Sequence, residues 1–444
     1  RKNFDKFKID GYIIPKNDEF FSEYAKNDRL KKISNFSGSA GIAIILKKKN
    51  YLFVDGRYTL QALKESGENF QITEIHKKHP SNIIKGLTLG LNPKLFTSNQ
   101  LKYYFSNKTK FNFINTDLID QIYKNKIYKS KPFFSLKKTI IGESHKSKIK
   151  KIRKFIKQNN VDYLFISAPE NVAWLLNIRG SDNPNSPIPN CRLIIGKKKE
   201  LFFISEKLKT LNLIKEKKIN KQQIIEPKKL VPLINNLKKK KFIVDSKSCS
   251  IFYENIIRSK FIIKNNEDPC YLLKSIKNST EISHTIKAHI QDGVALTKFI
   301  YWIKNENKKL INEDDAQKKL EKFRKLNKNY LFPSFNTIAG SGSNGAIVHY
   351  RAPQKNSKTI NKKDIFLCDS GGQYKYGTTD VTRTICFSKQ KANIKNIFTK
   401  VLKGHIAVAQ TNLNKDNTGK KIDIRARKFL KKDGLDYAHG TGHG

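Results

Sequence analysis

The sequence predicts a fold class of α/β and α+β type, in which two α/β units precede an α+β unit. The chain has 444 residues, which is too long for one ordinary hydrophobic core. Short apolar strands alternate with helical patterns in the first part, whereas long helices precede a cluster of strands in the last part. These observations predict three domains, at residues 1–133, 134–268 and 269–444.

The first unit contains apolar runs bounded by glycine, proline and polar residues, which are typical of strands. The expected strands are 11–15, 41–46 and 51–54. A polar turn joins the last two, which predicts a hairpin. A helix is expected at 57–65, with Leu60 and Leu63 on one side. The pattern breaks around Lys131 and Pro132, where this unit is expected to end.

The second unit opens with a helix at 147–159 whose apolar stripe lies opposite its lysines. The stripe consists of Ile149, Ile152, Phe155 and Ile156. A further helix is expected at 170–176, and strands at 163–166, 192–195, 201–204, 242–244 and 261–263. This order resembles that of the first unit and predicts a second copy of its architecture.

The third unit begins near Asp268 and Pro269. A long helix is expected from a cap at Thr280 and Glu281 to about Asn305. Apolar residues keep helical spacing along it at Ile282, Ile286, Ile290, Val294 and Phe299. Two more helices are expected at 314–326 and 394–410, and strands between 337 and 387. Long helices ahead of strands favour an α+β unit over a doubly wound sheet.

The net charge of +50 would attract any polyanion. Lysine is scattered along the whole chain, however, and arginine, the residue that forks onto guanine and phosphate, is sparse by comparison. We therefore expect weak adhesion to nucleic acid at low salt and no specific nucleic-acid partner. No apolar run is long enough to predict a membrane span.

The five cysteines are widely spaced and odd in number. They form no CxxC pair, so the sequence predicts neither a disulfide framework nor a thiolate zinc site. A reduced, cytoplasmic protein is the better interpretation. The chain begins at Arg1 rather than at methionine and stops abruptly at Gly444, which predicts a fragment of a longer protein.

Two aspartates, Asp369 and Asp380, lie on either side of a glycine-containing turn. One strand is expected at 365–368 and another at 376–387, in which Asp380 and Thr382 share a face. A hairpin would bring the two carboxylates together, where they repel each other unless a proton or cations intervene. The spacing leaves two interpretations open: a pair of metal ions, or two solvated turn residues.

Three histidines lie in glycine-bounded segments. His439 and His443 are four positions apart in a glycine-rich end, and His349 lies in an apolar run, 344–350, that resembles a strand. His443 favours the metal interpretation because it adds an imidazole to the two carboxylates, and His439 could reach the same cavity. The alternatives are a mobile glycine-rich tail and a structural role for His349.

Longer motifs occur in all three units. They are 10–15, 35–41 and 54–58 in the first, 172–182 in the second, and 340–350, 369–374, 377–384 and 439–444 in the third. With these motifs the chain resembles the Xaa-Pro aminopeptidases (aminopeptidase P) of the three-domain cytosolic type. That resemblance implies two creatinase-N-terminal-like α/β domains followed by a pita-bread catalytic domain, incomplete here.

The resemblance also implies the roles of the site residues. Asp369, Asp380 and His443 are expected to bind metal, with Asp380 bridging two ions. His349 and His439 are expected to act as catalytic and substrate-binding residues. The family's two glutamate ligands lie beyond the motif at 439–444, so the 444-residue chain is expected to bind metal weakly and to show little or no activity.

The expected cofactor is a pair of divalent ions, best matched by Mn(II), because hard oxygen ligands with one imidazole suit such ions. A hydroxide bridging them would attack the carbonyl before proline, releasing the N-terminal residue from peptides with proline second. The alternatives are a prolidase-type Xaa-Pro dipeptidase and a non-enzymatic pita-bread module that binds peptides or proteins. Similar enzymes often form homodimers, although the sequence shows no interface signature.

Overall fold

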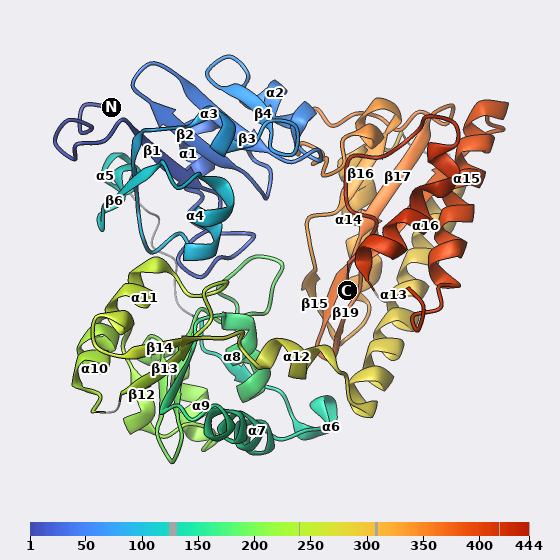
Figure 1. The fold of residues 1–444 in the computed structure, drawn as a ribbon. Helices are drawn as coiled ribbons and strands as arrows, with labels where there is room; N and C mark the ends of the chain where they lie inside the picture. The colour runs from blue at the N-terminus through green and yellow to red at the C-terminus, as the bar shows by residue number, and fades with distance from the viewer. Residues whose placement is uncertain (124–130, 239, 307–309, 417, 444) are drawn as a thin grey trace.

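The computed structural model describes residues 1–123, 131–238, 240–306, 310–416 and 418–443. Figure 1 shows three units: the first in blue, the second in green below it, and the third in yellow to red at the side. The first two units are each organised around one six-stranded sheet, whereas the third contains two smaller sheets.

The first unit has a sheet with the strand order β4-β3-β2-β1-β5-β6. The strands are β1 (Gly11–Pro15), β2 (Ile42–Leu46), β3 (Asn50–Val54), β4 (Gln71–Glu74), β5 (Thr88–Leu91) and β6 (Lys110–Phe113). The helices are α1 (Arg29–Ser34), α2 (Thr59–Ser66), α3 (Pro80–Ile83), α4 (Ser98–Tyr104) and α5 (Leu118–Ile122). The predicted hairpin is confirmed, because β2 and β3 pair antiparallel.

The second unit has a sheet with the order β12-β11-β10-β8-β13-β14. The strands are β8 (Tyr163–Ile166), β10 (Arg192–Gly196), β11 (Leu201–Ile204), β12 (Ile224–Ile225), β13 (Lys241–Val244) and β14 (Ile262–Asn265). The helices are α7 (His145–Gln158), α8 (Pro169–Leu176), α9 (Leu211–Lys215), α10 (Leu230–Asn236) and α11 (Ile251–Arg258). A short helix α6 (Lys138–Ile141) and a strand pair, β7 (Phe134–Ser135) with β9 (Ile178–Arg179), lie beside it.

The two sheets have the same topology. In each, three strands joined by antiparallel pairing are flanked by strands that pair in parallel. The strands β1, β2, β3, β4, β5 and β6 correspond in order to β8, β10, β11, β12, β13 and β14. The prediction of a second copy of the first architecture is therefore confirmed.

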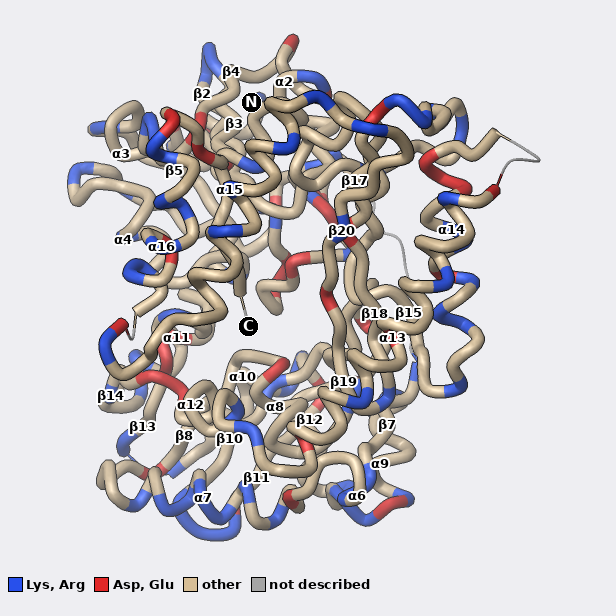
Figure 2. The backbone as a smooth tube through the Cα atoms, turned by 90° about the vertical axis from the view of Figure 1, so that its right-hand side faces the viewer, with Lys and Arg blue, Asp and Glu red and all other residues tan. Residues whose placement is uncertain are grey.

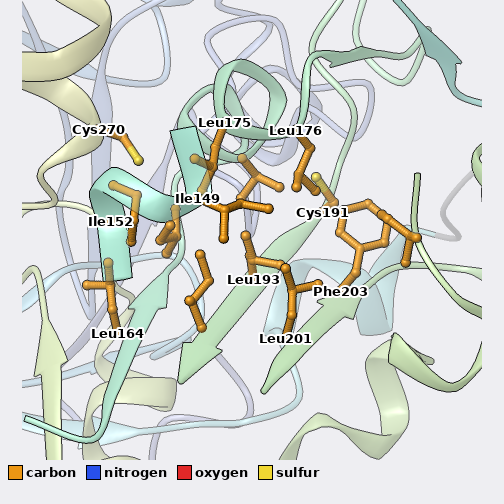
Figure 3. Packing of buried hydrophobic residues seen from close by; sticks show 14 of the residues in the cluster. Ile149, Ile152, Leu164, Leu175, Leu176, Cys191, Leu193, Leu201, Phe203 and Cys270 are labelled. Carbon is orange, nitrogen blue, oxygen red and sulfur yellow. The ribbon is translucent and has the colours of Figure 1, made fainter. Parts of the chain in front are cut away.

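The predicted stripe of α7 faces the core of the second unit. Ile149, Ile152 and Ile156 are buried in one cluster with residues of β8 and β10, and Phe155 packs against its margin. Figure 3 shows Ile149 and Ile152 close to Leu164 and Leu193 of the sheet. Each buried aliphatic side chain stabilises the fold by about 1.5–3 kcal/mol, so this helix is held firmly.

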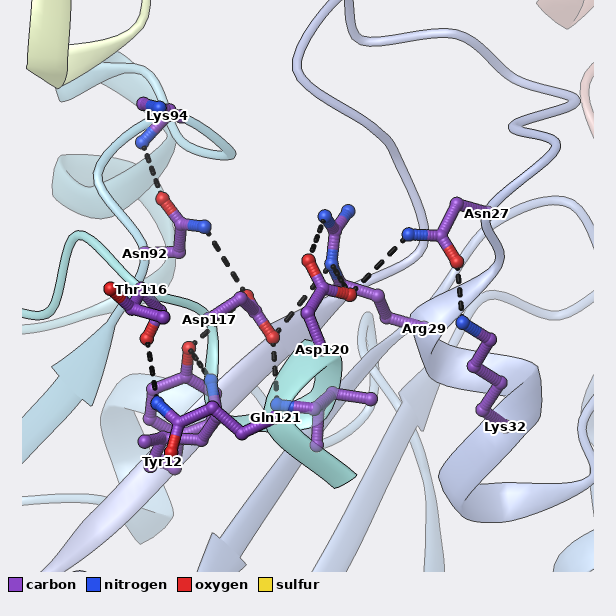
Figure 4. A network of polar contacts seen from close by, with 12 residues as sticks. Tyr12, Asn27, Arg29, Lys32, Asn92, Lys94, Thr116, Asp117, Asp120 and Gln121 are labelled. Carbon is purple, nitrogen blue, oxygen red and sulfur yellow. Dashed lines mark hydrogen bonds and ion pairs between the residues drawn. The ribbon is translucent and has the colours of Figure 1, made fainter. Parts of the chain in front are cut away.

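A buried polar network fixes α5 against α1 and β1 in the first unit (Figure 4). Arg29 donates to both oxygens of Asp120, at 3.0 and 2.6 Å. Asp117 accepts hydrogen bonds from Tyr12 at 3.1 Å and from the backbone N–H of Ile119 at 2.9 Å. Because these groups satisfy one another, the charges are tolerated in the interior.

The third unit begins with the helices α12 (Cys270–Ser275), α13 (Ser279–Asn305) and α14 (Glu313–Lys325). Its sheets have the orders β15-β18-β19 and β16-β17-β20. The strands are β15 (Tyr330–Pro333), β16 (Ile338–Ser341), β17 (Ile365–Ser370), β18 (Gly372–Tyr374), β19 (Gly377–Thr378) and β20 (Val381–Cys386). The helices α15 (Ala392–Ala409) and α16 (Gly419–Lys431) follow and pack on each other.

Two predicted apolar faces are not core faces. On α13, Ile282, Ile286, Ile290 and Val294 are exposed, and only Phe299 of the predicted stripe is buried. The helix instead buries the face that carries Asp292, which accepts hydrogen bonds from Arg324 at 2.7 and 3.0 Å. On α2, Leu60 and Leu63 are exposed while Ala62 and Ser66 are buried. Periodicity predicted these helices but not the face that packs.

The cap predicted at Thr280 and Glu281 is displaced by two residues. Asn278 is the N-cap of α13, and its side chain accepts a hydrogen bond from the backbone N–H of Glu281. The Glu281 carboxylate in turn accepts one from the backbone N–H of Asn278 at 3.0 Å. Glu281 therefore belongs to the start of the helix as predicted, but as the partner of Asn278 in a reciprocal capping box.

The single hairpin expected between 365–368 and 376–387 is wrong in detail. β17 and β20 do pair antiparallel, but β18 and β19 form a separate hairpin in the neighbouring sheet. The chain bends at Gly371, where a Cβ atom would lie 2.0 Å from the Thr379 carbonyl oxygen. Only glycine permits this approach, so the bend transfers the chain between the two sheets.

Charged residues are spread over the whole molecule. Figure 2 shows lysine and arginine on segments of all three units. None of the helices in the described ranges combines the length and the apolar composition that a membrane span requires. All five cysteines are free thiols, and four of them are buried.

Candidate metal and peptide site

Asp369 and Asp380 are neighbours because of the register between two strands. Asp369 is in β17, and its Cα is paired with that of Thr382 in β20. Asp380 directly precedes Val381, the first residue of β20. The two carboxylates therefore lie at the same end of an antiparallel pair.

The Asp369 carboxyl is partly buried, and one of its oxygens lacks a partner. Oδ1 is shielded from solvent and accepts no hydrogen bond within the described part of the chain. Burial is the main cause that raises the pKa of Asp369 from 3.8 to about 6. The nearby charge of Asp380 raises this pKa further, whereas a hydrogen bond from Thr382 and the proximity of His443 lower it. Such an unsatisfied buried oxygen costs about 1–3 kcal/mol, which a bound cation would offset.

His443 completes a group of three possible ligands. Its Nε2 lies 3.3 Å from Oδ2 of Asp380. The His443 side chain is 81% exposed and that of Asp380 is 45% exposed, compared with the partly buried Asp369. The sequence left open that both aspartates are solvated turn residues. Asp369 does not fit that interpretation, because its Oδ1 is shielded from water.

Arg427 of α16 holds the segment that leads to His443. Its guanidinium donates to the Asp436 carboxylate and to the backbone carbonyls of Tyr437 and His439, each at 2.7 Å. It also donates to Asp423 on its own helix, at 2.9 and 3.0 Å. One side chain thus fixes three points of the segment, since its planar fork offers several donors.

His439 lies in the same segment with its ring outside the aspartate pair. Its Nδ1 is 2.7 Å from the Gly440 carbonyl oxygen, and its ring stacks on Tyr437 with centroids 4.6 Å apart. Within the described residues its side chain forms no hydrogen bond or ion pair with Asp369 or Asp380. The structure therefore brings His443 to the aspartates, and His439 to the adjacent surface.

His349 does not lie in a strand, and the expectation for 344–350 is wrong. A short 3-10 helix, η4 (Gly342–Ala346), is followed by a turn that contains His349. The glycines permit this, because a Cβ atom on Gly340 would lie 2.8 Å from the backbone nitrogen of Gly345. The backbone therefore folds back upon itself where an apolar strand was predicted.

Glu313, which is fully buried at the start of α14, organises the loop that contains His349. It accepts hydrogen bonds from the backbone N–H of Ser341 at 2.7 Å, from the Asn344 amide at 3.0 Å and from the Tyr350 hydroxyl at 2.7 Å. A buried carboxylate is stable only when it is satisfied in this manner. The position of His349 is consequently set by the interior of the third unit.

His349 also contacts the first unit. Its Nδ1 lies 2.5 Å from the hydroxyl of Tyr58, and the two rings meet edge to face with centroids 5.2 Å apart. Burial, followed by the nearby positive charge of Arg57, lowers the pKa of His349 below 6.5. A second contact lies close by, because a Cβ atom on Gly56 would be 2.6 Å from the Ala438 carbonyl oxygen.

The candidate ligands are neighbours rather than a closed metal cage. Across the described ranges, no three His, Cys, Asp or Glu side chains already have the geometry that would hold an ion. The chemistry of the group still suits a divalent cation, since it combines two carboxylates, one with an unsatisfied oxygen, and an imidazole.

Three residues with structural roles at the site received no role from the sequence. Tyr58 lies inside the motif 54–58, which gave a signal but no function. Glu313 directly precedes the helix predicted at 314–326, where an acidic residue is ordinary. Arg427 gave no signal, because its three contacts outside α16 depend on how the chain folds after that helix.

Family models match the second and third units. The model described as Creatinase/Prolidase N-terminal domain matches residues 124–281. The model described as Metallopeptidase family M24 matches residues 283–444, which include both aspartates and all three histidines of the candidate site. The fold and the site thus define a metallopeptidase-type protein with creatinase-like N-terminal domains.

Curated relatives match over nearly the whole chain. Xaa-Pro aminopeptidase 1 of Dictyostelium discoideum is 34% identical over 470 residues, covering 98% of this chain and 74% of its own. An Xaa-Pro aminopeptidase of Drosophila melanogaster is 33% identical, covering 98% of this chain and 75% of its own. The chain belongs to the Xaa-Pro aminopeptidases, a family of M24 metallo-aminopeptidases.

A solved structure shows the same three-unit layout. The X-prolyl aminopeptidase of Caenorhabditis elegans, described as a cytosolic enzyme with a di-nuclear active site, superposes with a TM-score of 0.87. It is 25% identical to this chain, with 98% of this chain and 75% of that chain covered. An Xaa-Pro dipeptidase of Bacillus anthracis shares the fold over 68% of this chain, with a TM-score of 0.53.

Proposed function

We propose that this protein is an aminopeptidase that releases the N-terminal residue from peptides with proline in the second position, and that it uses two divalent metal ions. The observation that carries the proposal is the group of Asp369, Asp380 and His443. A buried oxygen without a partner and an imidazole 3.3 Å from the second carboxylate are the features that a metal centre needs.

In this proposal Asp369, Asp380 and His443 would hold the ions. When bound, such ions make a water nucleophilic near neutral pH and polarise a carbonyl oxygen. The protein positions the peptide: His349, held by Glu313 and Tyr58, contacts the substrate from one side. His439 is the second candidate for a substrate contact, from the surface beside Tyr437.

Mn(II) is the proposed ion. The donor set contains two hard carboxylates and one imidazole, without a cysteine thiolate. Hard oxygen donors favour Mg(II)- and Mn(II)-type ions over thiolate-bound zinc, and the imidazole favours Mn(II) within that group. Titrating the metal-free protein with Mn(II), Zn(II) and Mg(II) in parallel tests this choice.

An aminopeptidase is favoured over a prolidase-type dipeptidase by the extent of the fold. This chain has two six-stranded units before its third unit, and the X-prolyl aminopeptidase superposes over 98% of it. Curated Xaa-Pro aminopeptidases likewise match over 98% of this chain. A non-enzymatic peptide- or protein-binding module is the least supported alternative, because the three candidate ligands are present and adjacent.

The test compares three peptides with the protein expressed at its natural length and loaded with Mn(II). We expect release of Xaa from Xaa-Pro-Yaa, slower cleavage of the dipeptide Xaa-Pro, and no cleavage of Xaa-Ala-Yaa. Faster cleavage of the dipeptide would establish a prolidase. No turnover of any peptide would contradict the proposal.

The 444-residue chain by itself is proposed to bind metal weakly and to hydrolyse little. Two of its three candidate ligands, Asp380 and His443, are exposed. Their side chains must become ordered when the metal binds, and this entropic cost lowers the affinity. Substantial hydrolysis by this chain alone would refute this part of the proposal.

The remaining partners are also proposals. Lysines and arginines occur on all three units (Figure 2), which supports weak, non-specific adhesion to polyanions rather than a specific nucleic-acid partner. Free thiols support a reducing, cytoplasmic location. A homodimer remains a prediction from family resemblance, and sedimentation of the purified protein tests it.

A further inference from the structure

A continuous line of hydrogen-bonding groups runs from the surface of the first unit to His349 in the third. Glu23 accepts a hydrogen bond from the Ser39 hydroxyl at 2.9 Å. The oxygen atoms of Ser39 and Tyr58 are 2.7 Å apart, and the Tyr58 oxygen is 2.5 Å from Nδ1 of His349. Ser39 and Tyr58 are buried, whereas Glu23 is exposed.

The direction of each hydrogen bond follows from counting protons. The Glu23 carboxylate accepts from the Ser39 hydroxyl and, as a carboxylate, has no proton of its own to give. Ser39 must therefore give its single proton to Glu23. Tyr58 must then donate its own proton to the Ser39 oxygen, which leaves the Tyr58 oxygen as an acceptor. The partner of that oxygen, Nδ1 of His349, must carry a proton.

The charge state of the ring is set by its surroundings. Burial and the positive charges of Arg57 and Arg351 disfavour the imidazolium, and together they outweigh the opposing effects of Glu23 and Asp55. The ring is therefore neutral at pH 7. A neutral imidazole has one protonated nitrogen, so Nε2 carries a lone pair. Among the described residues the His349 ring is hydrogen-bonded through Nδ1, and Nε2 takes part in no hydrogen bond there.

We infer that Tyr58 and Ser39 are positioning residues that hold His349 as its Nδ1–H tautomer, so that Nε2 accepts a hydrogen bond from an N–H group of the bound peptide. The protonation of Nδ1 follows from the hydrogen-bond contacts. The role of Nε2 as an acceptor from the peptide rests on the proposed function. A neutral ring of this tautomer cannot donate from Nε2. The developing oxyanion must therefore be stabilised by another group.

The packing around Tyr58 makes it suitable for this role. Its ring is fully buried and meets Phe36 edge to face with centroids 5.6 Å apart. The guanidinium of Arg57 lies over the same ring at 5.1 Å and is held by Asp55 at 2.8 and 2.9 Å. The hydroxyl is thus presented from a rigid support, as a positioning residue requires.

The experiment measures the protonated nitrogen of His349 by two-bond ¹H–¹⁵N NMR, on the 444-residue chain labelled at histidine. His349→Gln identifies the signal. The spectra are recorded above the pKa of the ring in wild type, Tyr58→Phe and Ser39→Ala. Tyr12→Phe is the matched control, because Tyr12 is another buried tyrosine of the first unit, and its hydroxyl donates to Asp117 instead.

In wild type we expect Nδ1 to be protonated in roughly tenfold excess over Nε2, the ratio that one hydrogen bond of about 1.4 kcal/mol provides. Tyr58→Phe removes the acceptor, so both tautomers become populated. Ser39→Ala frees the Tyr58 proton to point at Nδ1, so the Nε2–H tautomer takes over. Tyr12→Phe leaves the ratio as in wild type.

Several results would overturn the inference. They are a wild-type ring protonated mainly on Nε2, an unchanged ratio in Tyr58→Phe or Ser39→Ala, and an equal shift in the Tyr12→Phe control. Circular dichroism of each variant establishes that it is folded, and Tyr58→Phe keeps the buried ring. The readout requires no turnover, so its failure is distinct from failure of the proposed function.

Discussion

The two sides of the candidate site differ in how firmly the fold holds them. Asp369 lies in an antiparallel sheet with one oxygen buried, and His349 is fixed between two units by Tyr58. His443 is 81% exposed, and the segment that leads to it depends on Arg427. The fold therefore positions Asp369 and His349 in advance, whereas the position of His443 depends on a few polar contacts at the surface.

The two α/β units have the same sheet topology but differ in what they contribute to the candidate site. After β3 the first unit presents Tyr58, which is buried and contacts His349. After the corresponding β11 the second unit presents Leu208, which is 69% exposed. The second unit contacts the third elsewhere, where Gln373 donates to the Asn185 carbonyl at 3.1 Å. The fold supplies a frame, and single residues upon it supply the function.

The largest expected effect separates the two sides of the site. Asp369→Asn, at the partly buried carboxylate of β17, should weaken Mn(II) binding by roughly 100-fold, because even groups that only orient a ligand contribute 10- to 100-fold. His443→Ala should weaken it by less than about tenfold in the 444-residue chain, since much of its benefit is lost in ordering an exposed side chain. Electron paramagnetic resonance titration measures both.

The matched control for that experiment is Asp364→Asn, an aspartate just before β17 whose ion-pair partner is Lys358. It should leave Mn(II) affinity unchanged. Equal losses in Asp369→Asn and His443→Ala would break the comparison, because both sides would then be equally preorganised.

A smaller effect concerns stability and pH. The pKa of Asp369 in the folded chain is about 6, above its ordinary 3.8. The folded chain therefore binds this proton more tightly than the unfolded chain does. The contribution of this proton to the stability of the folded chain is fully present below pH 3.8 and is lost as the pH rises through 6. Metal-free Asp369→Asn should therefore be more stable than wild type by about 1–2 kcal/mol at pH 7.

Urea denaturation in the presence of a chelator, repeated from pH 3 to pH 8, measures this difference. The advantage of Asp369→Asn should disappear below about pH 4, where both forms are uncharged. A variant that is less stable than wild type at pH 7 would show that the buried carboxylate carries no penalty.

The smallest effect tests the segment before His443. Arg427→Lys removes the fork that reaches Asp436, Tyr437 and His439, and should cost about 1 kcal/mol. Hydrogen exchange of residues 436–443 should accelerate. Arg425→Lys on the same helix is the control, because its ion-pair partner is Asp416. Equal acceleration in both variants would show that the segment is not held by Arg427.

Much of the fold could be predicted because local signals agree with it. The strands 11–15 and 163–166 are confirmed at both ends, as apolar runs bounded by turn residues. The packing face of α13 could not be predicted, because it depends on the pairing of Asp292 with Arg324, which are far apart in the sequence. The domain boundaries at 133 and 268 stay predictions.

The site was predictable only where motifs marked it. Asp369, Asp380 and His443 stay predicted ligands, and their proximity supports that prediction. The contact between Tyr58 and His349 joins residues 291 positions apart and depends on how two units meet. No local pattern contains that information, so only the folded chain could show it.

The most direct measurement is X-ray diffraction at the manganese absorption edge from crystals equilibrated with Mn(II). An anomalous peak is expected within about 2.5 Å of Asp369 Oδ1 and of an Asp380 oxygen, the distance at which carboxylates bind such ions. A peak at any other place, or none at saturating Mn(II), would contradict the assignment of these aspartates as metal ligands.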